Sequence, residues 1–386
     1  MIFPGIDETA RDPRPTALYV ATAEASIANS WTIINGWTAP LVYSDIDEEY
    51  HALLTDAALV DFGPLCRYII RGPMASNFLS RITTAPLDYI DIGESARGLI
   101  VSAGGGVVDM VDVSRLGEEM YLLTTSRPHA RRLQLANRGV DATVEDITGS
   151  IAALAIIGPK ARESAAKAGL AIGGEDLAAQ LTVRGVETSA RPIHYGAQSG
   201  IEILYPYDEA LTVWERVRRA SKIGPAGVAA LDALRIESGS PQPGADFVSA
   251  DDAAEPAQVR SPEALGLAHL APVNRAWFNG RRALSVSRKP ESRVLHVLAL
   301  DAEHIQAGAP VVRGGSVVGR VTSAAFSPRL KRAIAFADLD AGALGKPLRV
   351  EAKDGALHAA TLFATPEQAL AAAFKKSLEN STDLAS

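Results

Sequence analysis

The chain has 386 residues, of which 47% are hydrophobic and 22% are charged, and its formal net charge is -7. A chain of this length and composition buries a sizeable core and divides into two or three domains. The net negative charge and the absence of a basic stripe argue against nucleic acid as a partner. A single cysteine excludes an intramolecular disulfide and a multi-thiolate metal site, and it suits a cytoplasmic location.

Three further classes of protein find no support in the sequence. The amino-terminal region lacks the basic and apolar segments of a signal peptide, and the longest apolar run, 151–158, is far shorter than the ~20 residues that span a bilayer, so no membrane partner is expected. The seven histidines show no spacing that gathers a metal ion, so no metal site is expected. The glycines at 104–106 lack the dinucleotide-binding spacing, and we interpret them as a turn.

Residues 1–35 are polar, contain proline and show little periodicity. We interpret them as an extension that wraps over the first domain, and the sequence leaves open whether it covers a ligand channel, makes a dimer contact or only packs. An acidic run at 45–49 then predicts the start of a helix, because negative side chains favour a helix amino terminus. The apolar run 66–71 predicts a strand in which Cys66 is a buried, inert thiol.

A strand, a Gly-Pro pair and a helix follow one another twice along the chain. The first set is the strand 66–71, Gly72-Pro73 and a helix that carries Phe78, and the second is the strand 151–157, Gly158-Pro159 and the alanine-rich segment 160–169. The spacing of about 90 residues predicts duplicated units and internal pseudo-symmetry.

Two later segments have clear periodicity. Residues 207–221 place Val213, Trp214 and Val217 on one face of a helix, so Trp214 is predicted to lie in the core. After about residue 290, short strands separated by Gly314-Gly315 and Asp354-Gly355 predict a small antiparallel barrel or sheet, with a domain boundary near 285. The tail from Pro366 is predicted to form a final helix and a frayed end.

One short arc of sequence concentrates groups that suit ligand binding. It contains a tyrosine at 195, a strand carboxylate at 202 and a helix arginine at 235. Glycines flank these residues and allow the backbone to approach a flat ligand. We therefore interpret this arc as a binding site.

Several landmarks occur in the order found in the aminomethyltransferase family. They are Trp37-Thr38-Ala39-Pro40-Leu41, Leu59-Val60-Asp61-Phe62-Gly63, Gly72-Pro73, Gly105-Gly106, Gly158-Pro159, Gly200-Ile201-Glu202, Leu234-Arg235-Ile236-Glu237-Ser238-Gly239 and Gly319-Arg320-Val321. Over roughly residues 35–366 the chain resembles the glycine-cleavage T-protein and its tetrahydrofolate-dependent demethylase relatives. The resemblance implies an α+β cloverleaf of three domains around a folate channel: two interleaved, pseudo-symmetric α/β units at 36–285, a C-terminal antiparallel β-barrel at 286–366, and a tail at 367–386.

The resemblance also implies roles for individual residues. Glu202 matches the carboxylate that accepts hydrogen bonds from the pterin ring, a pairing that suits two oxygens and adjacent N–H donors. Arg235 matches an arginine that meets a carboxylate of folate or substrate, although a salt bridge to a neighbouring acid is equally compatible. Tyr195 and Tyr43 match tyrosines of the channel, with a structural role as the alternative for Tyr43. Gln198 replaces the first glutamate of the family pattern and is counted among the folate-binding residues.

Two departures from the family pattern affect the predicted reaction. Where aminomethyl-transferring members carry two successive aspartates, this chain has Asp109-Met110, and a thioether cannot accept a proton. Strand alternation directs Asp109 away from Met110 and places Asp112 on the same face as Met110, so Asp112 is a second candidate acid. The neutral Gln198 is more similar to the demethylase branch.

The predicted reaction is transfer of a methyl group from a small O-, S- or N-methyl donor to N5 of tetrahydrofolate. Tyr195, His194 or Asp109 would supply the acid that assists the leaving group, and the sequence does not rank them. The first alternative is aminomethyl transfer that gives methylene-tetrahydrofolate, with a lipoate-bearing carrier protein as partner. The second alternative is a non-catalytic folate-binding protein.

Overall fold

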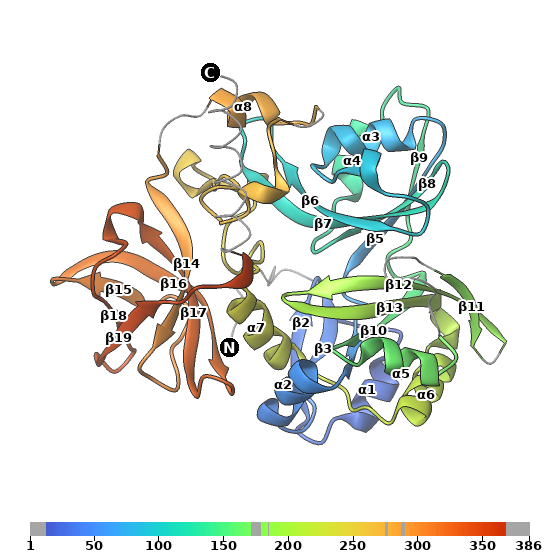
Figure 1. Cartoon of the computed structure of the whole chain (residues 1–386), viewed down its shortest axis with the longest axis horizontal. Coiled ribbons are helices and arrows are strands. Elements are labelled where there is room, and N and C mark those ends of the chain that lie inside the picture. Colours follow the sequence, from blue (N-terminus) through green and yellow to red (C-terminus); the bar gives the residue numbers. More distant parts are fainter. Residues whose placement is uncertain (1–12, 171–178, 184, 275–276, 287–289, 368–386) are drawn as a thin grey trace, which may run out of the picture.

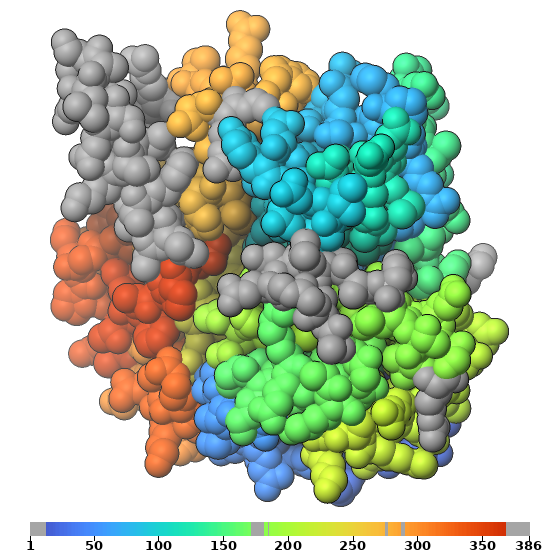
Figure 2. All heavy atoms as spheres, turned by 45° about the vertical axis from the view of Figure 1, so that its right-hand side comes forward, coloured from blue at the N-terminus to red at the C-terminus, as the bar shows by residue number. Residues whose placement is uncertain are grey.

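The computed structural model describes residues 13–170, 179–183, 185–274, 277–286 and 290–367. Figure 1 shows three lobes, of which two contain a sheet with helices against it and the third is a barrel. Figure 2 shows the same lobes as a space-filling surface, with the first sheet unit above the second and the barrel at the left. The predicted tail helix beyond residue 367 and the first twelve residues of the extension lie outside the described residues.

The first lobe is a five-stranded sheet in the order β6-β7-β8-β5-β9, with every neighbouring pair antiparallel. Two helices cover one face, where Phe78, Leu79 and Leu133 pack against strand residues such as Ile70. The elements are β5 (Cys66–Arg71), α3 (Ala75–Ile82), β6 (Ser95–Val101), β7 (Val107–Gly117), β8 (Met120–Thr125), α4 (Ala130–Ala136) and β9 (Thr143–Asp146).

The second lobe is a five-stranded sheet in the order β11-β12-β13-β10-β4. Strand β4 precedes the whole first sheet in sequence but pairs with β10 of the second, so the two sheets are interleaved along the chain. Trp214 is buried against this sheet, which confirms its predicted place in the core. The elements are α1 (Tyr19–Ala25), β4 (Ala58–Asp61), β10 (Ile151–Ile157), α5 (Ala161–Lys167), β11 (Ala179–Val183), β12 (Val186–Tyr195), β13 (Gln198–Pro206) and α6 (Ala210–Ser221).

The predicted repeat is confirmed by matching turns in the two units. Gly72 and Gly158 both adopt positive φ, 122° and 132°, in the left-handed region that favours glycine. In each turn the first helical residue donates its backbone N–H to the glycine carbonyl, over 2.9 Å from Ala75 and 3.0 Å from Ala161. The helices begin at these alanines, two residues after each glycine's proline.

The third lobe is a closed six-stranded barrel in the order β14-β17-β16-β15-β18-β19. This confirms the predicted antiparallel barrel, and both predicted hairpin turns join neighbouring strands, with positive φ at Gly314, Gly315 and Gly355. The strands are β14 (Arg293–Leu300), β15 (Pro310–Arg313), β16 (Ser316–Ser327), β17 (Arg332–Asp340), β18 (Leu348–Glu351) and β19 (Leu357–Leu362), and the short helix α8 (Arg281–Val286) precedes them.

Two further α-helices and a small sheet complete the α-helices and β-strands of the described residues. Helix α2 (Ile46–Thr55) begins where the acidic run predicts it, with the Asp45 side chain accepting from Asp47 N and Glu48 N. Helix α7 (Val228–Ser238) is buried along nearly all its length and packs against α2, β16 and β17. The small sheet is β1 (Arg14–Pro15), β3 (Trp37–Val42) and β2 (Ser30–Ile34).

The amino-terminal segment is more regular than its sequence predicts. It contributes α1, β1 and β2, and Leu18 and Ala21 pack into the core of the second unit. These elements have only two to seven residues, which is too short for an amphipathic period to show in the sequence. No helix in the described part of the chain is long and apolar enough to cross a membrane.

Candidate active site

A cavity of about 840 Å³ lies between the two sheet units. Its described lining comes from residues 14–245, namely the small amino-terminal sheet, strands of both larger sheets, helix α7 and the loop 240–245 that follows it. A cavity of this size, with apolar walls and a few convergent polar groups, is typical of a small-molecule site.

The hairpin between β2 and β3 forms part of the cavity wall. Asn35 and Gly36 make its turn with positive φ, and residues 33–36 line the cavity. The Asn35 amide donates to the carbonyl of Pro64 at 2.9 Å and to that of Ser126 at 2.7 Å. These two hydrogen bonds hold the β2–β3 hairpin against the cavity.

Glu202, on β13, is fully buried and lines the cavity. One carboxylate oxygen forms an ion pair with Arg67, and the other accepts from Nε of Arg191 at 2.6 Å. Burial by itself raises the pKa of this carboxyl, but the charges of Arg191 and Arg67 outweigh burial and lower the pKa to about 2. Glu202 is thus a fixed anion, and a carboxylate with about four lone-pair positions can still accept from a ligand.

The hairpin between β12 and β13 places Tyr195 and His194 on the cavity wall. The Tyr195 ring packs against Phe62, with 6.0 Å between the ring centroids. Burial, together with the nearby charge of Asp232, raises the pKa of the Tyr195 phenol, so the hydroxyl keeps its proton. His194 is exposed, and its carbonyl accepts from Arg97 at 2.8 Å.

Two predicted folate-binding residues present buried donors without partners in the described structure. Arg235 is 4% exposed and pairs with Asp232 at 2.7 Å and Asp246 at 2.6 Å, but its Nη2 has no hydrogen-bond partner. Tyr43 is 2% exposed, and its hydroxyl also has no partner. Both residues line the cavity. Because unsatisfied buried donors are costly, these two groups fit the role of ligand contacts.

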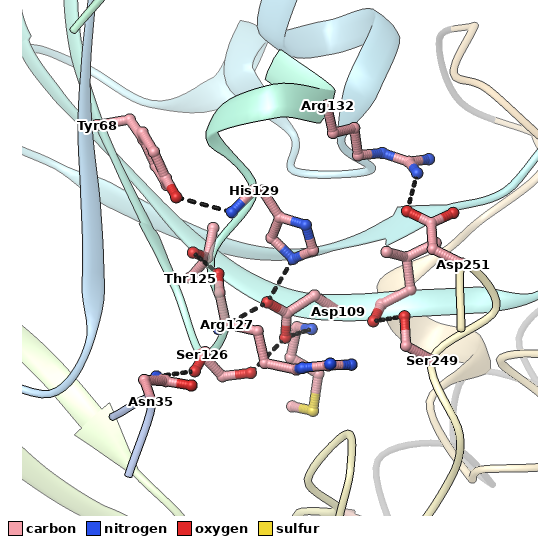
Figure 3. Close-up of polar contacts among 12 residues, drawn as sticks. Asn35, Tyr68, Asp109, Thr125, Ser126, Arg127, His129, Arg132, Ser249 and Asp251 are labelled. Atoms are coloured by element: carbon pink, nitrogen blue, oxygen red, sulfur yellow. Dashed lines mark hydrogen bonds and ion pairs between the residues drawn. The ribbon is translucent and has the colours of Figure 1, made fainter. Parts of the chain in front are cut away.

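The structure does not bring Asp109 or Gln198 to the cavity lining that it describes. Figure 3 shows that Asp109, which is fully buried, faces the loop before α4. Its carboxylate accepts from the Ser126 hydroxyl at 2.5 Å and lies 2.9 Å from Nε2 of His129. Met110 occupies the opposite face of β7 and lines the cavity, as strand alternation predicts.

Asp112 and Asp61 are carboxylates on the cavity wall. Asp112, the second candidate acid, pairs with Arg97 at 3.1 Å. Burial raises the pKa of Asp61 to about 6, in spite of hydrogen bonds from Thr16 and Gly63 that lower it. Sequence reasoning did not single out Asp61, although its position at the end of an apolar strand within a family landmark was an available signal.

Arg67 and Arg191 were also missed by sequence reasoning. Each is an arginine inside an otherwise apolar or alternating strand, and such a residue requires a buried partner. Arg191 faces its partner Glu202 across the β12–β13 hairpin, whereas Arg67 comes from the other sheet, so only the assembled fold brings Arg67 to Glu202.

Two interleaved sheet units and a barrel, with a large cavity that carries buried polar groups, define a multidomain ligand-binding protein of the α+β class. The comparisons with known families identify it further. The family model for the GCVT N-terminal domain matches residues 22–258, and that for the glycine cleavage T-protein C-terminal barrel domain matches residues 293–367. The chain belongs to the glycine cleavage T-protein family, which confirms the resemblance seen in the sequence.

Individual relatives agree with this assignment. The chain is 30% identical to the aminomethyltransferase of Deinococcus deserti, over 86% of this chain and 90% of that protein, and 30% identical to the aminomethyltransferase of Thermus thermophilus, over 84% and 91%. The crystal structure of the glycine cleavage system aminomethyltransferase T from Bartonella henselae is similar with a TM-score of 0.81 and 24% identity, and the match covers 92% of this chain and 98% of that one. The structural likeness confirms the three-domain fold.

Proposed function

We propose that the protein transfers a one-carbon unit to tetrahydrofolate inside the central cavity. Its family membership makes it an enzyme of the tetrahydrofolate-dependent one-carbon transferase class. The observation that supports this site is the set of buried groups in the cavity lining: the Glu202 carboxylate, and the Arg235 Nη2 and Tyr43 hydroxyl, which have no hydrogen-bond partner among the described residues.

These residues fit tetrahydrofolate in chemistry. Its pterin ring presents adjacent N–H donors, which Glu202 would accept, and its oxygen and carboxylate groups would accept from Arg235 and Tyr43. When bound, tetrahydrofolate supplies the nucleophilic nitrogen that receives the one-carbon unit. Holding both reactants in one cavity replaces a bimolecular encounter with an oriented one.

Proton transfer to the leaving group needs a donor near neutral pH. Asp61 fits this requirement, because its pKa of about 6 leaves part of the population protonated there. Tyr195 keeps its proton throughout the physiological range and would act as a hydrogen-bond donor. His194 stays a candidate at the same wall, whereas Asp109 would need a different arrangement of β7 to take part.

The comparisons support aminomethyl transfer best among the possible reactions. Relatives named aminomethyltransferase match most of the chain, and Asp112 keeps a carboxylate on the cavity wall beside the position of Met110. In this reaction the aminomethyl group would arrive on the lipoate arm of a carrier protein, which would be the partner of this protein.

Methyl transfer from a small O-, S- or N-methyl donor is the second candidate, and Met110 favours it. A thioether on the cavity wall neither binds an amine cation nor accepts a proton, and Asp112 is already paired with Arg97. An uncharged methyl donor requires neither function.

Mass spectrometry of the folate product separates these reactions. Purified protein is incubated with tetrahydrofolate and either an aminomethylated lipoate carrier or a panel of methoxylated aromatics, methylthio compounds and methylated amines. Methylene-tetrahydrofolate identifies aminomethyl transfer, and 5-methyl-tetrahydrofolate identifies a demethylase together with its donor. Folate binding without turnover would favour the binding-protein alternative, and no binding of tetrahydrofolate would contradict the whole proposal.

Met110 offers a direct variant test. Met110→Asp restores the family carboxylate, so it should raise aminomethyl transfer if that is the reaction and lower transfer from an uncharged methyl donor. Met110→Leu is the matched control, because it preserves size and hydrophobicity.

A further inference from the structure

We propose that Arg14, stacked on Trp37, binds a carboxylate of the ligand at the outer end of the cavity. This inference rests on the proposed function. It concerns a residue outside the part of the chain that the family model matches, which begins at residue 22.

Strand pairing sets the position of the Arg14 guanidinium. Arg14 and Trp37 are register partners in the parallel pair of β1 and β3. The guanidinium carbon lies 4.3 Å from the centre of the Trp37 ring, which is 8% exposed and thus a fixed surface. Stacking occupies the flat face of the guanidinium and leaves the N–H groups at its edge able to donate to a carboxylate.

Hydrogen bonds at Arg14 and at Thr16 hold the segment around Arg14 in place. The Arg14 backbone N–H donates to the Gly36 carbonyl at 2.8 Å, and the Thr16 hydroxyl donates to the Asp61 carboxylate at 2.6 Å. Arg14 and Asp61 both line the cavity. The arginine is thereby held in place before a ligand arrives, so less conformational entropy is lost when it binds.

Charge pairing distinguishes Arg14 from the other arginines of the cavity wall. The described cavity lining contains five arginines, including Arg14. The other four form ion pairs with carboxylates, whereas Arg14 forms none with any residue that the structure describes. The pairs are Arg97 with Asp112, Arg127 with Asp252, Arg191 with Glu202, and Arg235 with both Asp232 and Asp246. An arginine at a ligand cavity that has no counter-charge among the described residues is suited to an anionic ligand group.

The exposure of the wall residues indicates which end of the ligand Arg14 meets. Glu202 is fully buried, whereas Arg14 is exposed, so the cavity runs from a buried carboxylate to a solvent-facing guanidinium. A ligand with a flat hydrogen-bonding head and a carboxylate at its other end matches this polarity. The glutamyl tail of tetrahydrofolate has such carboxylates, and a carboxylate on the one-carbon donor is the other possible source.

Equilibrium binding tests the folate source. Anaerobic titration calorimetry compares the wild type, Arg14→Gln and the control Arg349→Gln, an exposed strand arginine of the barrel. Two ligands are used: tetrahydrofolate, and 6-methyltetrahydropterin, which lacks the glutamyl tail. If Arg14 binds the tail, Arg14→Gln should weaken tetrahydrofolate binding about tenfold, the size of one charge-assisted contact, and leave the pterin unaffected.

Steady-state kinetics tests the donor source. If Arg14 binds the donor instead, Arg14→Gln should raise the KM of a carboxylate-bearing donor about tenfold and leave the affinity for tetrahydrofolate unchanged. If Arg14→Gln changes neither the affinity for tetrahydrofolate nor the KM of the donor, the inference is overturned. If no donor is turned over by the wild type, the tetrahydrofolate titration alone decides. A wild type that binds no tetrahydrofolate would overturn the proposed function itself, so the two failures are distinguishable.

Discussion

Replacing Glu202 with glutamine removes the single negative charge between two buried arginines. A carboxyl whose pKa falls from an ordinary 4.5 to about 2 on folding contributes on the order of 3 kcal/mol to the free energy of unfolding at neutral pH. Glutamine cannot supply that charge and leaves Arg67 and Arg191 facing each other uncompensated, a situation that typically costs ~3–5 kcal/mol. We therefore expect Glu202→Gln to lose about 3 kcal/mol or more at pH 7.

Urea unfolding followed by circular dichroism measures this loss. The matched control is Glu145→Gln, because Glu145 is a strand glutamate whose ion pair with Arg71 is exposed and weak. Because the folded pKa is the lower one, the contribution of Glu202 is complete above about pH 4.5 and is lost as the pH falls through about 2. The difference between wild type and Glu202→Gln should therefore shrink between pH 4.5 and pH 2. Equal urea midpoints at pH 7, or a difference that does not vary with acidification, would refute this account of the charge cluster.

Four further outcomes are expected. Asp45→Ala should lower the free energy of unfolding by ~1 kcal/mol in a urea titration through loss of the α2 cap, and a change under a few tenths would contradict the capping role. Gly158→Ala should lower the melting temperature clearly, because the new Cβ would lie 2.5 Å from the Asp56 carbonyl at a φ of 132°; an unchanged melting curve would argue against this turn geometry. Cys66, whose thiol pKa is raised to about 12 chiefly by burial, should react with a thiol reagent at pH 8 only after unfolding, and rapid labelling of native protein would show that it is accessible. The kcat/KM of the transfer reaction should fall as pH rises through about 6, where Asp61 loses its proton, and Asp61→Asn should abolish that inflection; its persistence in the variant would assign it to another group.

The sequence predicted elements best where local periodicity was strong. Trp214 and its helix, and the barrel hairpins, were predictable because apolar spacing and glycine turns act within a few residues. The face of β7 was also predictable, since strand alternation alone separates Met110 from Asp109. The short elements before residue 35 were not, because a helix of seven residues shows too little of its period.

The site was predicted less completely than the fold. The family resemblance pointed to Glu202 and Arg235, which lie on the cavity wall, but it said nothing of the arginines that hold Glu202. Arg191 lies opposite Glu202 in the β12–β13 hairpin, but Arg67 lies on β5 of the other sheet, and its approach to Glu202 depends on how the two units meet. Long-range pairing of this kind has no signature in local sequence.

The interleaved strand β4 also has a consequence for synthesis of the chain. Val60 pairs with Ala155, so roughly 95 residues must leave the ribosome before β4 gains its neighbour β10. At about 5–20 residues per second, this strand, with Leu59 and Val60 buried in the finished protein, waits for several seconds without its sheet. During that interval it is an apolar edge that a chaperone can bind, and the first sheet unit is completed before the second can close.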